Sequence, residues 1–344
     1  MCALIQNAAR ALTLNNSRSV IAPIHTGTPI LYLGFSVLVV ALLAVDFVLL
    51  RTQGNHKVSV KEAALWSVVW VLAATAFGGW FWWYLNGQYG ADVASQKTLQ
   101  YATGYLIEKG LAIENVFVWI TIFTYFAIPA ELQKRVLLWG VVGAIVMRAG
   151  LIYVGALLIQ QFTWIFYVFG LFLVFTGIKM FLFTGKASDL GANPLLRWLR
   201  GHVPISDDLH GEKFSVVEAG KRVLTPLALV LVLVEVSDVI FAVDSIPAIF
   251  AVTSDPFVVF TANTFAILGL RAMYFMLADM ADRFHLLGYG LATIVSLVGV
   301  KMLVMEWYKV PVLWMLASVV VVLAVSVVAS LLVPRPPFPH ATQR

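Results

Sequence analysis

The chain has 344 residues, of which 61% are hydrophobic and only 12% are charged. Soluble domains carry about 25% charged residues, so the composition excludes a soluble globular protein and indicates a chain that crosses a membrane several times. The net charge of +5 does not indicate nucleic-acid binding, because an excess of Lys and Arg in cytoplasmic loops is normal for membrane proteins. The single cysteine, Cys2, excludes a disulfide framework and a thiolate metal site.

Apolar runs predict an all-α, polytopic membrane protein with about nine transmembrane helices. The predicted spans are 29–50, 63–85, 99–128, 136–159, 162–184, 223–252, 256–278, 284–306 and 310–333. Residues 1–28 lack the apolar core and the cleavage site of a signal peptide and are predicted to be an N-terminal tail. The predicted divisions are two leading helices in 29–98, a three-helix unit in 99–184, an extramembrane loop in 185–222, a second three-helix unit in 223–306, and the last helix with the C-terminal tail in 307–344.

The distribution of Lys and Arg predicts the orientation. With the N-terminus outside, fourteen basic residues lie in inside segments and four lie in outside segments. Cytoplasmic loops carry the basic excess, so we expect the N-terminus outside, the C-terminus in the cytoplasm and the loop 185–222 in the cytoplasm.

Residues 223–252 contain three acids inside an apolar stretch: Glu235, Asp238 and Asp244. A carboxylate in mid-membrane costs roughly 2.5–3.5 kcal/mol, and an acid in such a place marks a functional site. At 3.6 residues per turn, one straight helix cannot bring acids at these spacings to one point. The segment therefore needs a break or a second segment that completes the site.

Pro247 predicts the break. Its ring clashes with the carbonyl four residues earlier and it lacks an N–H group, so we expect the helix to kink or unwind near Asp244 and Ser245. The unwound backbone would then offer oxygen atoms beside the carboxylate.

A second acidic segment lies in residues 99–128, with Glu108 and Glu114. Its EKGLAIEN resembles the DVIFAVDS that begins at Asp238, MRAGLIY resembles LRAMYF, and GIKM resembles GVKM, the last two pairs about 122 to 123 residues apart. Three matches in the same order predict an internal duplication. Because each unit has three spans, the copies are expected to be inverted, with the substrate near the midplane where they meet.

The predicted metal site consists of oxygen donors from both acidic segments: Glu108, Glu114, Asn115, Glu235, Asp238, Asp244 and Ser245. Oxygen ligands without His or Cys suit Mn²⁺, Mg²⁺ or Ca²⁺. Close carboxylates in a dry site also exchange protons, which suits exchange of a metal ion against protons. The alternative is that the acids form structural salt bridges with intramembrane counter-charges, for which the candidates are Lys109, Arg148 and Arg271.

No catalytic motif in a supporting context indicates an enzyme. An intramembrane aspartyl protease also has acids in separate spans, but its GxGD motif is missing here. We therefore predict a non-enzymatic protein.

The segments IEKGLAIENVFVW and VLVEVSDVIFAVDSIPAIFAVTSDPF closely resemble the TerC family of bacterial membrane proteins, in particular its Alx-type members. The resemblance runs from about residue 29 to residue 310. It implies Mn²⁺ export across the bacterial inner membrane, with alkaline pH and manganese as cues. Mn²⁺ would be the transported substrate, with no prosthetic group, and the partners would be the lipid bilayer, Mn²⁺ and protons, with no nucleic acid.

The resemblance also assigns residues. The family's acids fall on Glu108, Glu235, Asp238 and Asp244, and its Asp-Asn pair falls on Glu114 and Asn115. The Glu at 114 is one methylene longer than the usual Asp, which leaves the selectivity among Mn²⁺, Mg²⁺ and Ca²⁺ open. Two alternative functions stay open as well, a membrane partner that supplies metal to or scaffolds exported proteins, and a tellurite-resistance protein.

Overall fold

A computed structural model describes residues 26–52, 59–162, 164–183, 196, 198, 202–206, 208–218, 220–278, 286–308 and 310–333, with the backbone alone for residues 49–52, Glu114 and Phe183. The helices are α2 (Pro29–Thr52), α3 (Val60–Tyr89), α4 (Ala91–Tyr125), α5 (Ala130–Gln161), α6 (Ile165–Phe183), α8 (Pro226–Phe250), α9 (Pro256–Leu268), α10 (Leu270–Ala278), α11 (Leu287–Leu303) and α12 (Val312–Leu332). One antiparallel hairpin, β1 (Ser215–Glu218) and β2 (Lys221–Leu224), interrupts the helical pattern.

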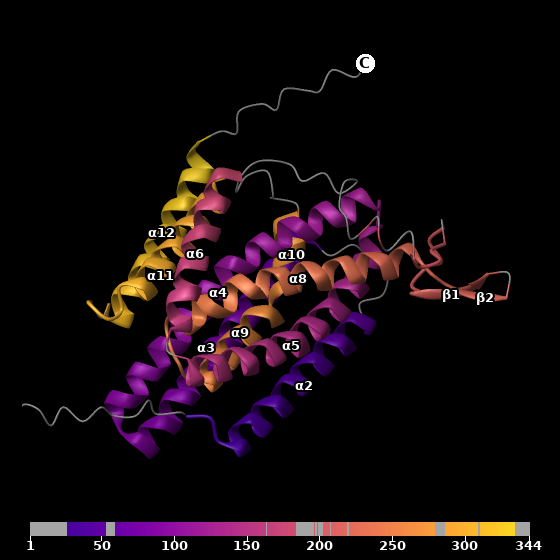
Figure 1. Ribbon diagram of the computed structural model, residues 1–344. Helices are drawn as coiled ribbons and strands as arrows, with labels where there is room; N and C mark the ends of the chain where they lie inside the picture. The colour runs from indigo at the N-terminus through magenta and orange to yellow at the C-terminus, as the bar shows by residue number, and fades with distance from the viewer. Residues whose placement is uncertain are drawn as a thin grey trace, which may run out of the picture.

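The helices form two groups that meet at α4 and α8. In one group, α6 and α12 flank α11, and Figure 1 shows the three side by side at the left of the molecule. In the other group, α4 packs against α3 and α9, and α5 packs against α8 and α9. The hairpin of β1 and β2 extends from the bundle beside the start of α8 (Figure 1).

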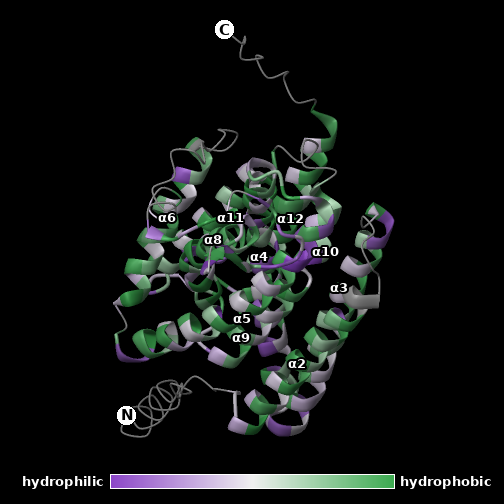
Figure 2. Ribbon diagram, turned by 90° about the vertical axis from the view of Figure 1, so that its right-hand side faces the viewer, coloured by the Kyte–Doolittle hydropathy of each residue, from purple (hydrophilic) through white to green (hydrophobic). Residues whose placement is uncertain are grey.

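The outer helices present apolar side chains outward. Exposed residues such as Ile30 and Leu33 on α2, Leu171 on α6 and Leu331 on α12 would be unfavourable in water but are favourable in lipid. Figure 2 shows mainly hydrophobic residues along these helices. The chain is therefore a multi-pass membrane protein.

The nine predicted spans each fall on a helix or on a helix pair, but nine crossings are not confirmed. Among the described residues, six helices are long and apolar enough to cross a membrane, or seven if α9 and α10, bent by 40°, form one broken span. α4, which carries Glu108, Lys109 and Glu114, and the 17-residue α11 are not among them.

The helix does not unwind at Pro247 as predicted. α8 is helical from Pro226 to Phe250, and Pro247 lies inside its last turn. A proline lacks the N–H that would bond to the carbonyl four residues earlier, so one intrahelical hydrogen bond is lost. The carbonyls that follow belong to the last turn, and the last four carbonyls of any α-helix have no intrahelical partner. The bend in this half of the chain lies instead at Gly269, between α9 and α10.

The segment between the second and third predicted spans is helical rather than a loop. α3 continues to Tyr89 and α4 begins at Ala91, with Gly90 between them at φ 85°. Only glycine adopts this conformation without strain, so one residue suffices to reverse the chain.

The predicted inverted repeat stays a prediction. In such a repeat, α4, α5 and α6 would correspond to α8, α9 and α11. The observed contacts fit this correspondence, because α5 packs on α8 as α9 packs on α4, and α6 packs on α11.

Candidate functional site: a buried polar pocket between α4, α5, α6 and α8

Arg148 of α5 joins the two acidic helices. Its Nη2 and Nε donate to the two carboxylate oxygens of Asp238 on α8, at 2.8 and 3.1 Å, and its Nη1 forms an ion pair with Glu108 on α4. The three side chains are at most 2% exposed. Carboxylates so deeply buried need a partner of opposite charge, and one guanidinium here serves two.

Two neutral side chains complete this cluster. Ser245 accepts a hydrogen bond from Arg148 Nη1 at 3.3 Å, and Asn115 Nδ2 donates to Asp238 Oδ1 at 3.2 Å. The Glu108 Oε2 and Asn115 Oδ1 atoms are buried without a hydrogen-bond partner among the described residues. A buried oxygen in this state is unfavourable unless a water or an ion fills its coordination sphere.

Asp244 lies in a different charge environment. Its carboxylate accepts a hydrogen bond from Thr176 Oγ1 of α6 at 3.2 Å, and within the described part of the chain no Lys or Arg forms an ion pair with it. Lys179 acts on it electrostatically from α6 without such a contact.

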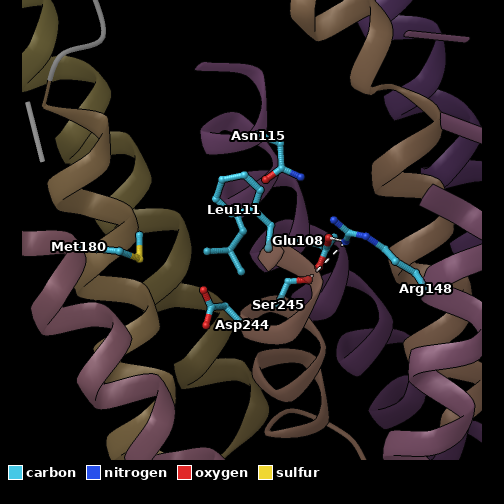
Figure 3. Close-up of a pocket in the computed structure, with 8 residues that line it drawn as sticks. Glu108, Leu111, Asn115, Arg148, Met180, Asp244 and Ser245 are labelled. Atoms are coloured by element: carbon cyan, nitrogen blue, oxygen red, sulfur yellow. Dashed lines mark hydrogen bonds and ion pairs between the residues drawn. The ribbon is translucent and has the colours of Figure 1, made fainter. Parts of the chain in front are cut away.

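A small pocket connects these groups. It is lined by Glu108, Leu111, Asn115, Arg148, Met180, Phe241, Asp244 and Ser245, and it has room for about one water-sized sphere. In Figure 3, Arg148, Glu108 and Ser245 lie on one side of the pocket, and Asp244 lies on the side nearer Met180. With all groups ionised, the carboxylates of Glu108, Asp238 and Asp244 and one guanidinium leave two negative charges, which one divalent cation would neutralise.

The structure brings only part of the predicted site together. Glu108, Asn115, Asp244 and Ser245 line the pocket, and Asp238 contacts it through Arg148 and Asn115. Within the described residues, no three His, Cys, Asp or Glu side chains lie close enough together to hold a metal ion. The ligands of a cation here would therefore include neutral oxygens. The predicted ligand Glu114 has its backbone on α4, and its side chain lies outside the described part of the chain.

Glu235 does not line the pocket. Its carboxylate lies against the backbone of α5, where a Cβ on Gly143 would come within 2.0 Å of Oε1, and its buried Oε2 has no hydrogen-bond partner among the described residues. Glu235 and Asp244 are nine residues apart in the continuous helix α8 and therefore lie at different depths along it.

The three predicted counter-charges have different roles. Arg148 forms ion pairs with Glu108 and Asp238, as expected. Arg271 instead forms an ion pair with Asp46 of α2, outside the predicted cluster. Lys109 Nζ donates to the backbone carbonyl of Ala266 at 3.3 Å and forms no ion pair within the described residues.

Sequence reasoning missed Thr176 and Met180. Both belong to the segment TGIKM of α6, whose GIKM was noted only as one half of an internal repeat. The repetition of this motif is the one feature of the sequence that could have indicated a role for α6 in the site. The pairing of Thr176 with Asp244 itself depends on how α6 packs on α8.

Comparisons with known proteins match most of the chain, including the helices that line the pocket. A model of the integral membrane protein TerC family matches residues 93–336. The chain is 55% identical over 286 residues, 83% of its length and 89% of the relative's, to the "Putative membrane-bound redox modulator Alx" of Escherichia coli strain K12. It is 52% identical over 302 residues to the protein of the same name from Salmonella typhi (88% and 94% of the two lengths) and 44% identical over 309 residues to an uncharacterized membrane protein of Myxococcus xanthus (90% and 94%).

No solved structure matches the chain. The family match covers α4 to α12, which includes every helix that contributes to the pocket. The chain is thus a member of the TerC family of integral membrane proteins.

Proposed function

We propose that this protein is a secondary transporter that exports Mn²⁺ across the bacterial inner membrane in exchange for protons. The observation that carries the proposal is the pocket between α4 and α8, where buried oxygens without a partner, Glu108 Oε2 and Asn115 Oδ1, share one small space with the carboxylate of Asp244. Carboxylate, amide and hydroxyl oxygens are the ligands of hard divalent cations, and Mn²⁺ accepts such a set.

The charge balance of the pocket supports a divalent substrate. Arg148 compensates one of three carboxylates and leaves about two negative charges inside the bundle. An empty site can lower this charge by taking protons, because neighbouring carboxylates in a low dielectric favour protonation. Protons and the metal ion would then compete for the same oxygens, which is the basis of an exchange mechanism.

Arg148 limits where the cation can bind. A guanidinium repels a second cation, and it already occupies the space between Glu108 and Asp238. The cation would therefore bind on the Asp244 side of the pocket, with Glu108 Oε2, Asn115 Oδ1 and Ser245 Oγ within the same lining.

The test is clearance of manganese from cells that lack other manganese exporters. Asp244→Asn keeps the size of the side chain and removes its charge, so accumulated Mn²⁺ should rise to the level of cells without the protein, and Glu114→Gln should act in the same direction. Asp92→Asn is the matched control, because Asp92 is an exposed acid in the first turn of α4, away from the pocket. The proposal is wrong if Asp244→Asn and Glu114→Gln still clear manganese as the unchanged protein does.

A second candidate is a membrane partner that supplies metal to exported proteins or scaffolds them without moving the ion itself. The relatives' name, a redox modulator, describes an effect on the cell and names no transported ion, so it suits this candidate as well. Purified protein in liposomes separates the two, because a partner protein alone would move no Mn²⁺. A tellurite-resistance role by export of the oxyanion is disfavoured, because an anion needs donors and positive charge where this pocket has carboxylates.

A further inference from the structure

Met180 is the one side chain among the eight that line the pocket to carry sulfur. It belongs to α6, and in Figure 3 its thioether points into the pocket from the side where Asp244 lies. The other donors of the lining are carboxylate, amide and hydroxyl oxygens. This arrangement places a soft donor beside the carboxylate that has no ion-pair partner among the described residues.

From this geometry we infer that Met180 is a specificity-determining residue, which lets the pocket favour Mn²⁺ over Ca²⁺ and Mg²⁺. The inference rests on the proposed function and adds the residue that selects the ion. Ca²⁺ and Mg²⁺ are hard ions that take oxygen ligands and gain little from a thioether. Mn²⁺ is a transition-metal ion, the weakest binder of its series, but it accepts nitrogen or sulfur donors beside oxygens. A site built from oxygens alone would have to separate these ions by cavity size and ligand number.

The competing explanation is that Met180 fills space. It is partly buried and packs against the core that includes Leu173, Leu291 and Val298. Methionine often has this role in irregular cores. A test must therefore keep the packing and change only the chemistry of the donor atom.

The chain contains a matched control for this test. The motif GIKM that ends at Met180 recurs as GVKM, which ends at Met302. Met302 lies on α11 in the same core, is 2% exposed and does not line the pocket. The same substitution at Met302 therefore changes packing alone.

The experiment uses the full chain in liposomes and measures Mn²⁺ uptake against increasing Ca²⁺ and, separately, Mg²⁺. For Met180→Leu, we expect Mn²⁺ transport to persist, while Ca²⁺ inhibits at a concentration about tenfold lower, the scale of effect that residues around a metal typically have. Met302→Leu should keep the ion competition of the unchanged protein. Met180→Gln, which replaces the sulfur by hard amide atoms of similar reach, should shift the competition further toward Ca²⁺.

Equilibrium binding of Mn²⁺ and Ca²⁺ to the purified proteins gives a second readout that does not depend on transport. The inference is overturned if Met180→Leu and Met180→Gln leave both the competition and the ratio of the two affinities unchanged in protein that still transports Mn²⁺. An unchanged protein that neither binds nor moves Mn²⁺ overturns the proposed function, and the inference with it.

Discussion

Arg148 holds together two half-sites that lie far apart in the chain. Its partners Glu108 and Asp238 come from α4 and α8, and all three side chains are nearly inaccessible. Burial of an ion pair contributes little net stability, but removal of one partner leaves an uncompensated charge that is strongly destabilising. Arg148 therefore has a structural role beside the pocket as well as an electrostatic role within it.

Arg148→Met should lower the free energy of unfolding by about 3–5 kcal/mol, because two buried carboxylates lose their counter-charge. Thermal unfolding of purified protein in detergent measures the effect. Arg135→Met is the control, because the ion pair of Arg135 with Glu212 is exposed and exposed pairs contribute about 0–1 kcal/mol.

The triple variant Arg148→Met, Glu108→Gln, Asp238→Asn separates charge from packing. It removes the two carboxylate charges that are paired with Arg148, so most of the lost stability should return. A triple variant that is as unstable as Arg148→Met would show that Arg148 acts through its packing and not through its charge.

The contact between α6 and α11 fixes the wall of the pocket that carries Thr176 and Met180. The two helices approach closely at glycines: a Cβ on Gly299 would come within 2.8 Å of the backbone atoms Gly170 O and Val174 N. Small residues allow this kind of close packing between membrane helices. The position of Met180 thus depends on the absence of a side chain on the facing helix.

Gly299→Ala should push α6 away from α11, because backbone atoms cannot rotate aside as a flexible side chain can. We expect a loss of about 1–3 kcal/mol in stability, as for other overpacked sites, and slower Mn²⁺ transport because Thr176 and Met180 move from Asp244. Gly34→Ala on α2 is the control, since a Cβ there meets nothing within 4 Å. Equal thermal stability and equal transport in the two variants would contradict this account of the α6–α11 contact.

Across the whole bundle, two points connect the leading segment with α2 to the helix pair α9 and α10. At one end, Asp255, which caps α9, accepts hydrogen bonds from Thr26 and forms an ion pair with Lys97 at 2.9 Å. Further along α2, Asp46 forms an ion pair with Arg271 of α10. The leading helix, which precedes the family match, is therefore an integral part of the bundle.

The proposed orientation can be tested with the single cysteine removed. In a Cys2→Ala background, Gln88→Cys at the exposed end of α3 should react with a membrane-impermeant maleimide in intact spheroplasts. Lys221→Cys on β2, also exposed, should react only after the membrane is opened. The reverse pattern would mean that the N-terminus faces the cytoplasm.

The structure also bears on the register of the internal repeat. The sequence comparison aligned Glu108 with Asp238, yet the residues in contact are Asn115 and Asp238, which are 123 residues apart. Arg148 and Arg271 have the same separation. Two residues related by a two-fold axis contact each other only where they lie near that axis, so the contact of Asn115 with Asp238 is consistent with a register of 123 for a repeat that remains a prediction.

The sequence alone determined the class of the protein and the places of its helices. Long apolar runs specify membrane helices locally, and each predicted span falls on a helix or on the pair α9 and α10. Charged residues within apolar runs also identified Glu108, Arg148, Asp238 and Asp244 as the residues to examine, because such charges are costly in a membrane.

The pairing of these charges follows from the way the helices pack. Glu108 and Asp238 form ion pairs with one arginine, and Asp244 accepts a hydrogen bond from Thr176. Glu235 lies outside the pocket against Gly143, and Arg271 forms an ion pair with Asp46. A pattern along one helix sets which face a residue occupies, but partners that are 40 to 225 residues apart are chosen by how the helices pack. That packing depends on close contacts such as those of Gly143 and Gly299, which no local pattern specifies.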